Sequence, residues 1–174
     1  ATSALGIFLV KGEGKGEIKE GMGVILKSFA ISAVVSIVGF FFLANIVTSD
    51  NRLAVATTIG IVLSVVIFFL TEYQTGDHKP VRDIAKQSQT GPATVILSGL
   101  VSGFSSTVWA ILVIGITILA SFFLFSDPLT VAYGVSLAGM GMLTTTGLIV
   151  SMDSFGPIAD NAQGIAELSG IKGK

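Results

Sequence analysis

Cysteine is absent from this 174-residue chain, which excludes disulfide frameworks, thiolate zinc sites and cysteine nucleophiles. Charge is also scarce, because 12% of the residues are charged whereas a soluble domain has about 25%. Ten Lys and Arg residues face eleven Asp and Glu residues, for a net charge of −1, so the chain lacks the basic field that nucleic-acid binding needs. The composition argues against both a soluble enzyme and a nucleic-acid-binding protein.

What the chain has in excess is apolar side chains and glycine. Hydrophobic residues make up 51% of the sequence, the mean hydropathy is +0.85, and 21 residues are glycine. Glycine-rich, strongly apolar sequence is typical of packed membrane helices, in which small residues let two backbones approach closely.

The few charges are clustered, and they leave four long stretches without an ionisable side chain: Ser28–Ser49, Leu53–Thr71, Gln87–Ser126 and Pro128–Met152. A helix needs about 20 apolar residues to cross the hydrocarbon core. We therefore predict an all-α, polytopic transmembrane bundle, with spans near 28–49, 53–74, 92–126 and 128–152 and a partial span near 1–10. The last span continues into residues 153–168, and residues 1–174 form one segment of a larger membrane domain.

The connections between these spans differ in length and in charge. The two long ones, 11–27 and 75–91, carry seven Lys and Arg residues, whereas the tight turns carry only Arg52. Because positive residues accumulate in cytoplasmic loops, we expect a multi-pass integral membrane protein with its long loops in the cytoplasm. The sequence that follows the last span falls on the same side.

An acidic pattern follows the last span. Asp153, Asp160 and Glu167 are seven residues apart, and seven helical positions return to within about 20° of the same direction. The intervening residues are small and apolar, so we expect this stripe to be largely enclosed. Enclosed carboxylates need a partner or a cation, and Mg²⁺ prefers such hard oxygen ligands, often shared with a phosphate.

Pro157 lies between the first two acids. Proline cannot donate a hydrogen bond to the carbonyl four residues earlier, so a kink here would let Asp153 and Asp160 converge on one point. A second interpretation stays open at this stage. In it, the Gly-Pro pair ends the span and the acids are simply solvated.

The motif Asp153-Ser-Phe-Gly-Pro-Ile-Ala-Asp-Asn-Ala-Gln-Gly-Ile-Ala-Glu167 resembles the long acidic motif of the membrane-bound, ion-pumping pyrophosphatases. Two further stretches resemble that family in order and spacing, one over residues 71–94 and one over 133–147. The resemblance covers essentially the whole chain. It departs from the family at Gln163, where the family motif usually has glycine.

This resemblance implies the central part of a sixteen-helix protein about four times as long that acts as a homodimer. Such a protein hydrolyses Mg-pyrophosphate at the cytoplasmic helix ends and exports H⁺ or Na⁺. By position in the motif, Asp160 and Asp153 would serve as catalytic and Mg²⁺-binding carboxylates, and Asn161 would support substrate binding. Some members also need K⁺, but the position that separates them lies outside these residues.

Four other residues are expected to have no direct part in catalysis. Glu72 and Arg82 match the family and are expected to order a loop through ion pairs, Glu167 is expected to play a supporting role, and His78 is expected to be solvated. The resemblance implies that the substrate-binding lysines and the other acidic motifs of the family lie on helices outside this chain. Because phosphoryl transfer needs charge neutralisation from several sides, the chain alone is expected to be inactive.

Two competing hypotheses remain. The acidic helix could bind a transported cation directly, as in a secondary transporter or channel, or the chain could be a purely structural membrane subunit. Exchanging Asp160 for alanine separates the three cases. The exchange abolishes pyrophosphate hydrolysis in a pyrophosphatase, alters only ion binding in a transporter, and does neither in a structural subunit.

Overall fold

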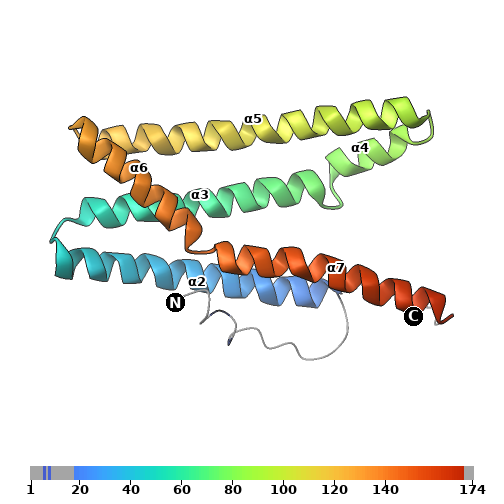
Figure 1. Ribbon diagram of the computed structural model, residues 1–174, viewed down its shortest axis with the longest axis horizontal. Helices are drawn as coiled ribbons and strands as arrows, with labels where there is room; N and C mark the ends of the chain where they lie inside the picture. The colour runs from blue at the N-terminus through green and yellow to red at the C-terminus, as the bar shows by residue number, and fades with distance from the viewer. Residues whose placement is uncertain (1–5, 7, 9–17, 171–174) are drawn as a thin grey trace. The chain divides into compact units, whose positions relative to one another are not determined.

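The computed structural model describes Gly6, Phe8 and residues 18–170, and these residues form helices without strands. The helices are α2 (Ile18–Val47), α3 (Asn51–Thr75), α4 (Lys79–Gln87), α5 (Pro92–Leu124), α6 (Pro128–Leu143) and α7 (Thr146–Leu168). Figure 1 shows them in chain order. The predicted all-α class is confirmed, while the partial span near 1–10 lies almost entirely outside the described residues.

Four helical stretches among the described residues are long and apolar enough to cross a membrane: Gly23–Val47, Asn51–Gln87, Pro92–Leu124 and Pro128–Leu168. Each overlaps one of the predicted spans, although the first and the third end two residues before the predicted ends at 49 and 126. Pro92 takes the first helical position of α5, as expected for a residue whose missing N–H costs nothing there. The sequence therefore predicted the number and order of the full spans correctly.

Two boundaries differ from the prediction because helices continue beyond the apolar runs. Residues 18–27, predicted as loop, begin α2, whose 30 residues measure about 45 Å against a hydrocarbon core of about 30 Å. The second long loop also contains the nine-residue helix α4. Water-exposed turns carry charges without ceasing to be helical, so charge marks the end of the apolar run and not the end of the helix.

The span predicted over residues 128–152 is divided. α6 ends at Leu143 and α7 begins at Thr146, with Thr145 fully buried between them. The interruption falls on three consecutive threonines, whose β-branched side chains restrict the helix. The predicted continuation into residues 153–168 is confirmed, because α7 runs to Leu168.

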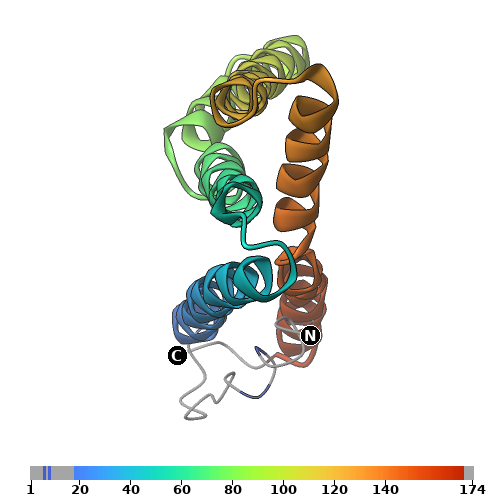
Figure 2. The same cartoon turned by 90° about the vertical axis from the view of Figure 1, so that its left-hand side faces the viewer.

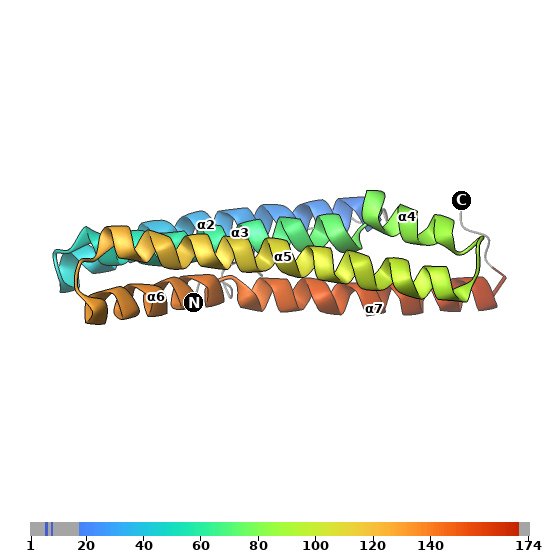
Figure 3. The same ribbon diagram turned by 90° about the horizontal axis from the view of Figure 1, so that it is seen from above.

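The described residues fall into two compact units, one of which covers Asp50–Met142. In this unit α3 and α5 run antiparallel and side by side, α4 lies across their shared end (Figures 1 and 3), and α6 crosses beside them (Figure 2). Its apolar core gathers buried residues of α3, of α6 and of the loop after α5, namely Ala56, Val131 and Phe125, with Leu53, Leu124 and Leu137 packed against them.

Glycine sets how closely α6 approaches α3. A Cβ atom on Gly60 would collide with the backbone of Ala138, and a Cβ atom on Gly141 would collide with the backbone of Thr57. Each helix thus contributes one glycine to the crossing, and the absent side chain makes room for the backbone of the other helix. This is the close approach that small residues permit between membrane helices.

The second unit covers Ala1–Ser49 and Leu143–Lys174, and α2 packs against α7 within it. Along α2 the buried residues include Ser28, Ser32 and Ser36, each at most 3% exposed and spaced four apart. Leu148 of α7 is 3% exposed. A row of buried serines thus lies along α2, where a helix of a soluble protein would have a stripe of leucines.

Burial in the described residues is inverted relative to a soluble protein. The buried set is rich in serine, threonine and alanine, whereas the large apolar side chains of α5, such as Phe104 and Phe123, are 70% and 90% exposed. Some of the buried hydroxyls are satisfied within their own helices: Ser36 donates to the Ser32 carbonyl at 2.7 Å and Thr117 to the Val113 carbonyl at 3.0 Å. Such a surface suits lipid or further protein rather than water.

The tight turns are fixed by short hydrogen bonds. Asp50 caps α3 by accepting from the Arg52 backbone N–H at 3.0 Å, and it pairs with the Arg52 guanidinium at 2.8 Å. These bonds from Arg52 hold the pKa of Asp50 below its ordinary value. Asp127 caps α6 in the same manner by accepting from the Leu129 N–H at 3.0 Å.

Candidate functional site

The acidic motif lies on α7, which continues as helix from Thr146 through Pro157 to Leu168. Of the second interpretation, the helix end at the Gly-Pro pair is therefore wrong, whereas its exposed acids are found. Because the segment stays helical, Asp153, Asp160 and Glu167 share one face, with about 10 Å along the axis between successive acids. The structure confirms the predicted acidic stripe.

The enclosure predicted for this stripe is not found in the chain. Asp153, Asp160 and Glu167 are all exposed, and no group of three or more His, Asp or Glu side chains gathers to hold a metal ion among the described residues. A continuous helix also keeps Asp153 and Asp160 one above the other instead of at one point. The prediction assumed that neighbouring small residues imply burial, whereas only a facing helix can bury this face.

Neighbouring motif residues show what this face offers. Asn161 is exposed, so its amide is accessible beside Asp160. Gln163, the position that departs from the family pattern, donates from Nε2 to the Glu167 carboxylate at 2.9 Å. This bond joins one side chain of the acidic stripe to the helix turn before it, a contact that a glycine could not make and that the sequence did not predict.

The loop between α3 and α4 is ordered by ion pairs. The Arg82 guanidinium donates to both oxygens of Asp77, at 2.9 and 3.1 Å, which confirms the predicted loop-ordering role of Arg82. Glu72 lies 3.5 Å from His78, and the His78 ring stacks on Tyr73 with centroids 5.3 Å apart. His78 thus contacts both residues while its side chain stays 44% exposed, which agrees with the expectation of a solvated histidine.

The turn between α4 and α5 is closed by hydroxyl groups. Thr94 lies 2.6 Å from the Thr90 hydroxyl and donates to the Gln87 carbonyl at 3.1 Å. Gly91 has a φ of 132°, a conformation that only glycine adopts without strain. The stretch over residues 71–94 that resembles the family thus forms structural joints between α3, α4 and α5.

The comparison with known proteins decides the family. The sequence model of the family described as inorganic H⁺ pyrophosphatase matches residues 1–174. The chain belongs to this family. The hypothesis of an unrelated structural subunit is thereby set aside, and the resemblance in the acidic motif is explained by common descent over the whole chain.

Individual members of the H⁺ pyrophosphatase family agree. The chain is 39% identical over 173 residues to the K⁺-insensitive pyrophosphate-energized proton pump of Methanosarcina mazei, with 97% of this chain and 25% of the relative covered. It is 50% identical over 139 residues to the proton pump of the same name from Chloroflexus aurantiacus, covering 75% and 18%. A Clostridium tetani relative, 41% identical over 171 residues and covering 96% and 25%, is provisionally named a K⁺-stimulated pyrophosphate-energized sodium pump.

These matches also fix the scale of the chain within the family. It spans about a quarter of the length of the M. mazei and C. tetani relatives. The relatives thus contain about three further quarters of polypeptide beyond the part that matches this chain and its exposed acidic stripe.

Proposed function

We propose that the protein to which this chain contributes is a membrane pyrophosphatase that hydrolyses Mg-pyrophosphate and couples the reaction to transport of H⁺ or Na⁺. The chain supplies one acidic helix of the site. The observation that carries the proposal is the unbroken helix α7, which presents Asp153 and Asp160 on one face at the end of a membrane-spanning stretch. The names of the relatives support pyrophosphate as the energy source.

The residues present suit Mg²⁺ in kind. Carboxylate oxygens are the ligands this ion prefers, and it usually takes one or two of them together with substrate phosphates and water. Asp160 and Asp153 lie too far apart on α7 to share one ion, so each would hold a Mg²⁺ ion of its own, and the Asn161 amide would donate to a phosphate oxygen. When bound, Mg²⁺ supplies charge neutralisation at the phosphates.

The remaining ligands come from the rest of the polypeptide. Two carboxylates about 10 Å apart on one helix leave most positions around a diphosphate open, and phosphoryl transfer depends on stabilisation from several sides. The role of this chain is therefore to hold its two acids at a fixed spacing while other helices complete the site. A homodimer in the lipid bilayer is part of the same proposal.

The proposal also includes the orientation of the chain in the membrane. The seven Lys and Arg residues of the two long connections support a cytoplasmic location for these connections and for α7's acidic end, by the positive-inside rule. K⁺ dependence differs among the named relatives, which include K⁺-insensitive and K⁺-stimulated pumps. A site for K⁺ therefore belongs to some family members, and residues elsewhere in the polypeptide decide it.

Exchange of Asp160 for asparagine in the full-length protein tests the function. We expect Mg²⁺-dependent pyrophosphate hydrolysis to fall by roughly 100-fold or more, because the substitution removes a charged ligand from a metal clamp. The measurement is phosphate release by the purified protein, together with ion uptake into proteoliposomes.

Asp127→Asn is the matched control, since asparagine also caps helices well and Asp127 caps α6. It should retain hydrolysis. If Asp160→Asn hydrolyses pyrophosphate normally but changes ion uptake, the transporter alternative is correct instead.

A further inference from the structure

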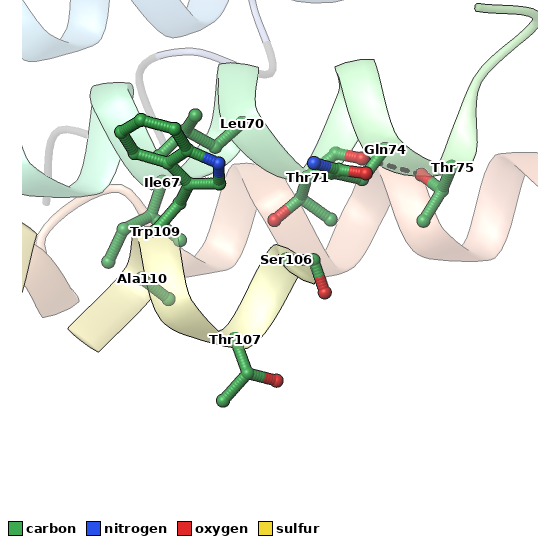
Figure 4. Close-up of a pocket in the computed structure, with 9 residues that line it drawn as sticks. All are labelled: Ile67, Leu70, Thr71, Gln74, Thr75, Ser106, Thr107, Trp109 and Ala110. Carbon is green, nitrogen blue, oxygen red and sulfur yellow. Dashed lines mark hydrogen bonds between the residues drawn. The ribbon is translucent and has the colours of Figure 1, made fainter. Parts of the chain in front are cut away.

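A pocket of about 220 Å³ lies between α3 and α5, well away in sequence from the acidic motif. Its lining comes from two short stretches, one on each helix: Ile67, Leu70, Thr71, Gln74, Thr75, and Ser106, Thr107, Trp109, Ala110. Figure 4 shows the Trp109 indole beside Ile67 and Leu70 at one end, and Thr71, Gln74 and Thr75 toward the other. Both helices belong to one compact unit.

The pocket lies at the level where the apolar part of α3 ends. The charge-free run Leu53–Thr71 is bounded by Arg52 and Glu72, and its 19 residues measure about 28 Å as helix, close to the thickness of a hydrocarbon core. Thr71 and Gln74 therefore lie on the two sides of the membrane–water boundary. Trp109 suits the same depth, since tryptophan is enriched at that boundary.

Polarity changes along the pocket in the same sense on both helices. On α3, Ile67 and Leu70 precede Thr71, Gln74 and Thr75 toward the boundary. On the antiparallel α5, Trp109 and Ala110 lie deeper than Ser106 and Thr107. The pocket is thus apolar at its membrane end and polar at its water end, which matches a molecule that itself crosses the boundary.

The pocket offers unused hydrogen-bond donors at its polar end and, from Trp109, at its deeper end. Thr75 donates to the Thr71 carbonyl at 2.8 Å, and Ser106 and Thr107 donate to the Gly103 carbonyl at 2.8 and 3.0 Å. By contrast, the Thr71 hydroxyl, the Gln74 amide and the Trp109 indole N–H have no acceptor among the residues that the structure describes. The ligand that complements these groups carries acceptors.

We propose that this pocket binds a membrane glycerophospholipid by its glycerol–ester region. The ester carbonyls are hydrogen-bond acceptors without donors of their own, and they accept from Thr71, Gln74 and Trp109. The acyl chains continue past Ile67 and Ala110 into the hydrocarbon. The pocket is smaller than the roughly 300–1,000 Å³ that encloses drug-sized ligands, so it holds this region of the lipid and not the whole molecule.

The experiment uses the full-length protein in liposomes of diester phosphatidylcholine that contain a trace of the same lipid with a photoreactive group near the top of one chain. After irradiation, mass spectrometry of the peptides locates the adducts. We expect adducts on the segments 67–75 and 106–110. The double variant Thr71→Val/Gln74→Leu should lower their yield roughly fivefold or more, the effect of losing one or two ordinary hydrogen bonds.

A matched control and a chemical test complete the design. Asn45→Leu removes an exposed amide near the end of α2 and should leave the adducts unchanged. A chain-matched diether lipid, which lacks the ester carbonyls, should compete roughly fivefold less well than the diester. This comparison uses the unaltered protein, so it decides the matter even if the double variant does not fold.

Adducts absent from the pocket, a double variant with unchanged yield, or equal competition by the diether would each overturn the proposal. None of these measurements depends on hydrolysis. The lipid site and the proposed pyrophosphatase function can therefore fail independently.

Discussion

Ser49 shows how a single residue ends a membrane helix. It has a positive φ of 54°, and its N–H donates to the Ala44 carbonyl at 2.9 Å, which closes the end of α2. A side chain makes this left-handed conformation costly, and glycine is the usual residue there. The serine is retained in a position that it does not favour.

Ser49→Gly should therefore stabilise the protein by about 0.5–1 kcal/mol. The measurement is the midpoint of thermal unfolding followed by circular dichroism in detergent. Ser169→Gly is the control, because Ser169 has an ordinary φ of −78° and glycine would gain nothing there. If both variants shift the midpoint equally, the strain at Ser49 does not contribute to stability.

At the scale of single residues the sequence predicted which acids share a helical face but not their surroundings. Asp153, Asp160 and Glu167 could be placed on one helical face from their spacing alone, and α7 has that face. The bond from Gln163 to Glu167 and the stacking of His78 on Tyr73 could not be predicted. They depend on side-chain rotamers, and neither spacing nor hydropathy reports these.

At the scale of whole helices, the crossing of α3 and α6 depends on two glycines. Gly60→Ala and Gly141→Ala each place a methyl group against backbone that cannot turn aside. We expect each to destabilise the protein by about 1–3 kcal/mol, the usual cost of overpacking. Thermal unfolding in detergent measures the loss.

Gly115→Ala on α5 is the control for these variants. Nothing lies within 4 Å of a Cβ atom at that position, and alanine favours helix over glycine by up to about 1 kcal/mol. Its unfolding midpoint should stay equal or rise. Equal destabilisation by all three variants would mean that glycine in these helices is needed for flexibility rather than for close packing.

The spans could be predicted because bilayer thickness fixes how long an apolar run must be. The early start of α2 and the existence of α4 could not, since helices outside the hydrocarbon need no apolar sequence. The break between α6 and α7 also escaped prediction. Three threonines can sit inside a helix or interrupt it, and packing within each unit decides which.

At the scale of the molecule, the exposed acidic stripe predicts that these residues do not catalyse alone. The chain purified in detergent with Mg²⁺ should hydrolyse pyrophosphate no faster than the uncatalysed rate, because one helix cannot surround a diphosphate. The full-length protein under the same conditions is the positive control. Mg²⁺-dependent turnover by the chain, lost in Asp160→Asn, would show that the site is complete here.

Ser36, Thr57 and Ser121 are buried in these helices, and each hydroxyl donates a hydrogen bond to a carbonyl of its own helix. These hydroxyl groups therefore donate no hydrogen bond to a neighbouring helix. At these positions neighbouring helices must recognise each other by shape, through the space that glycine, serine and alanine leave. At such contacts a substitution can replace an oxygen atom by a carbon atom of similar size, but it cannot add side-chain volume.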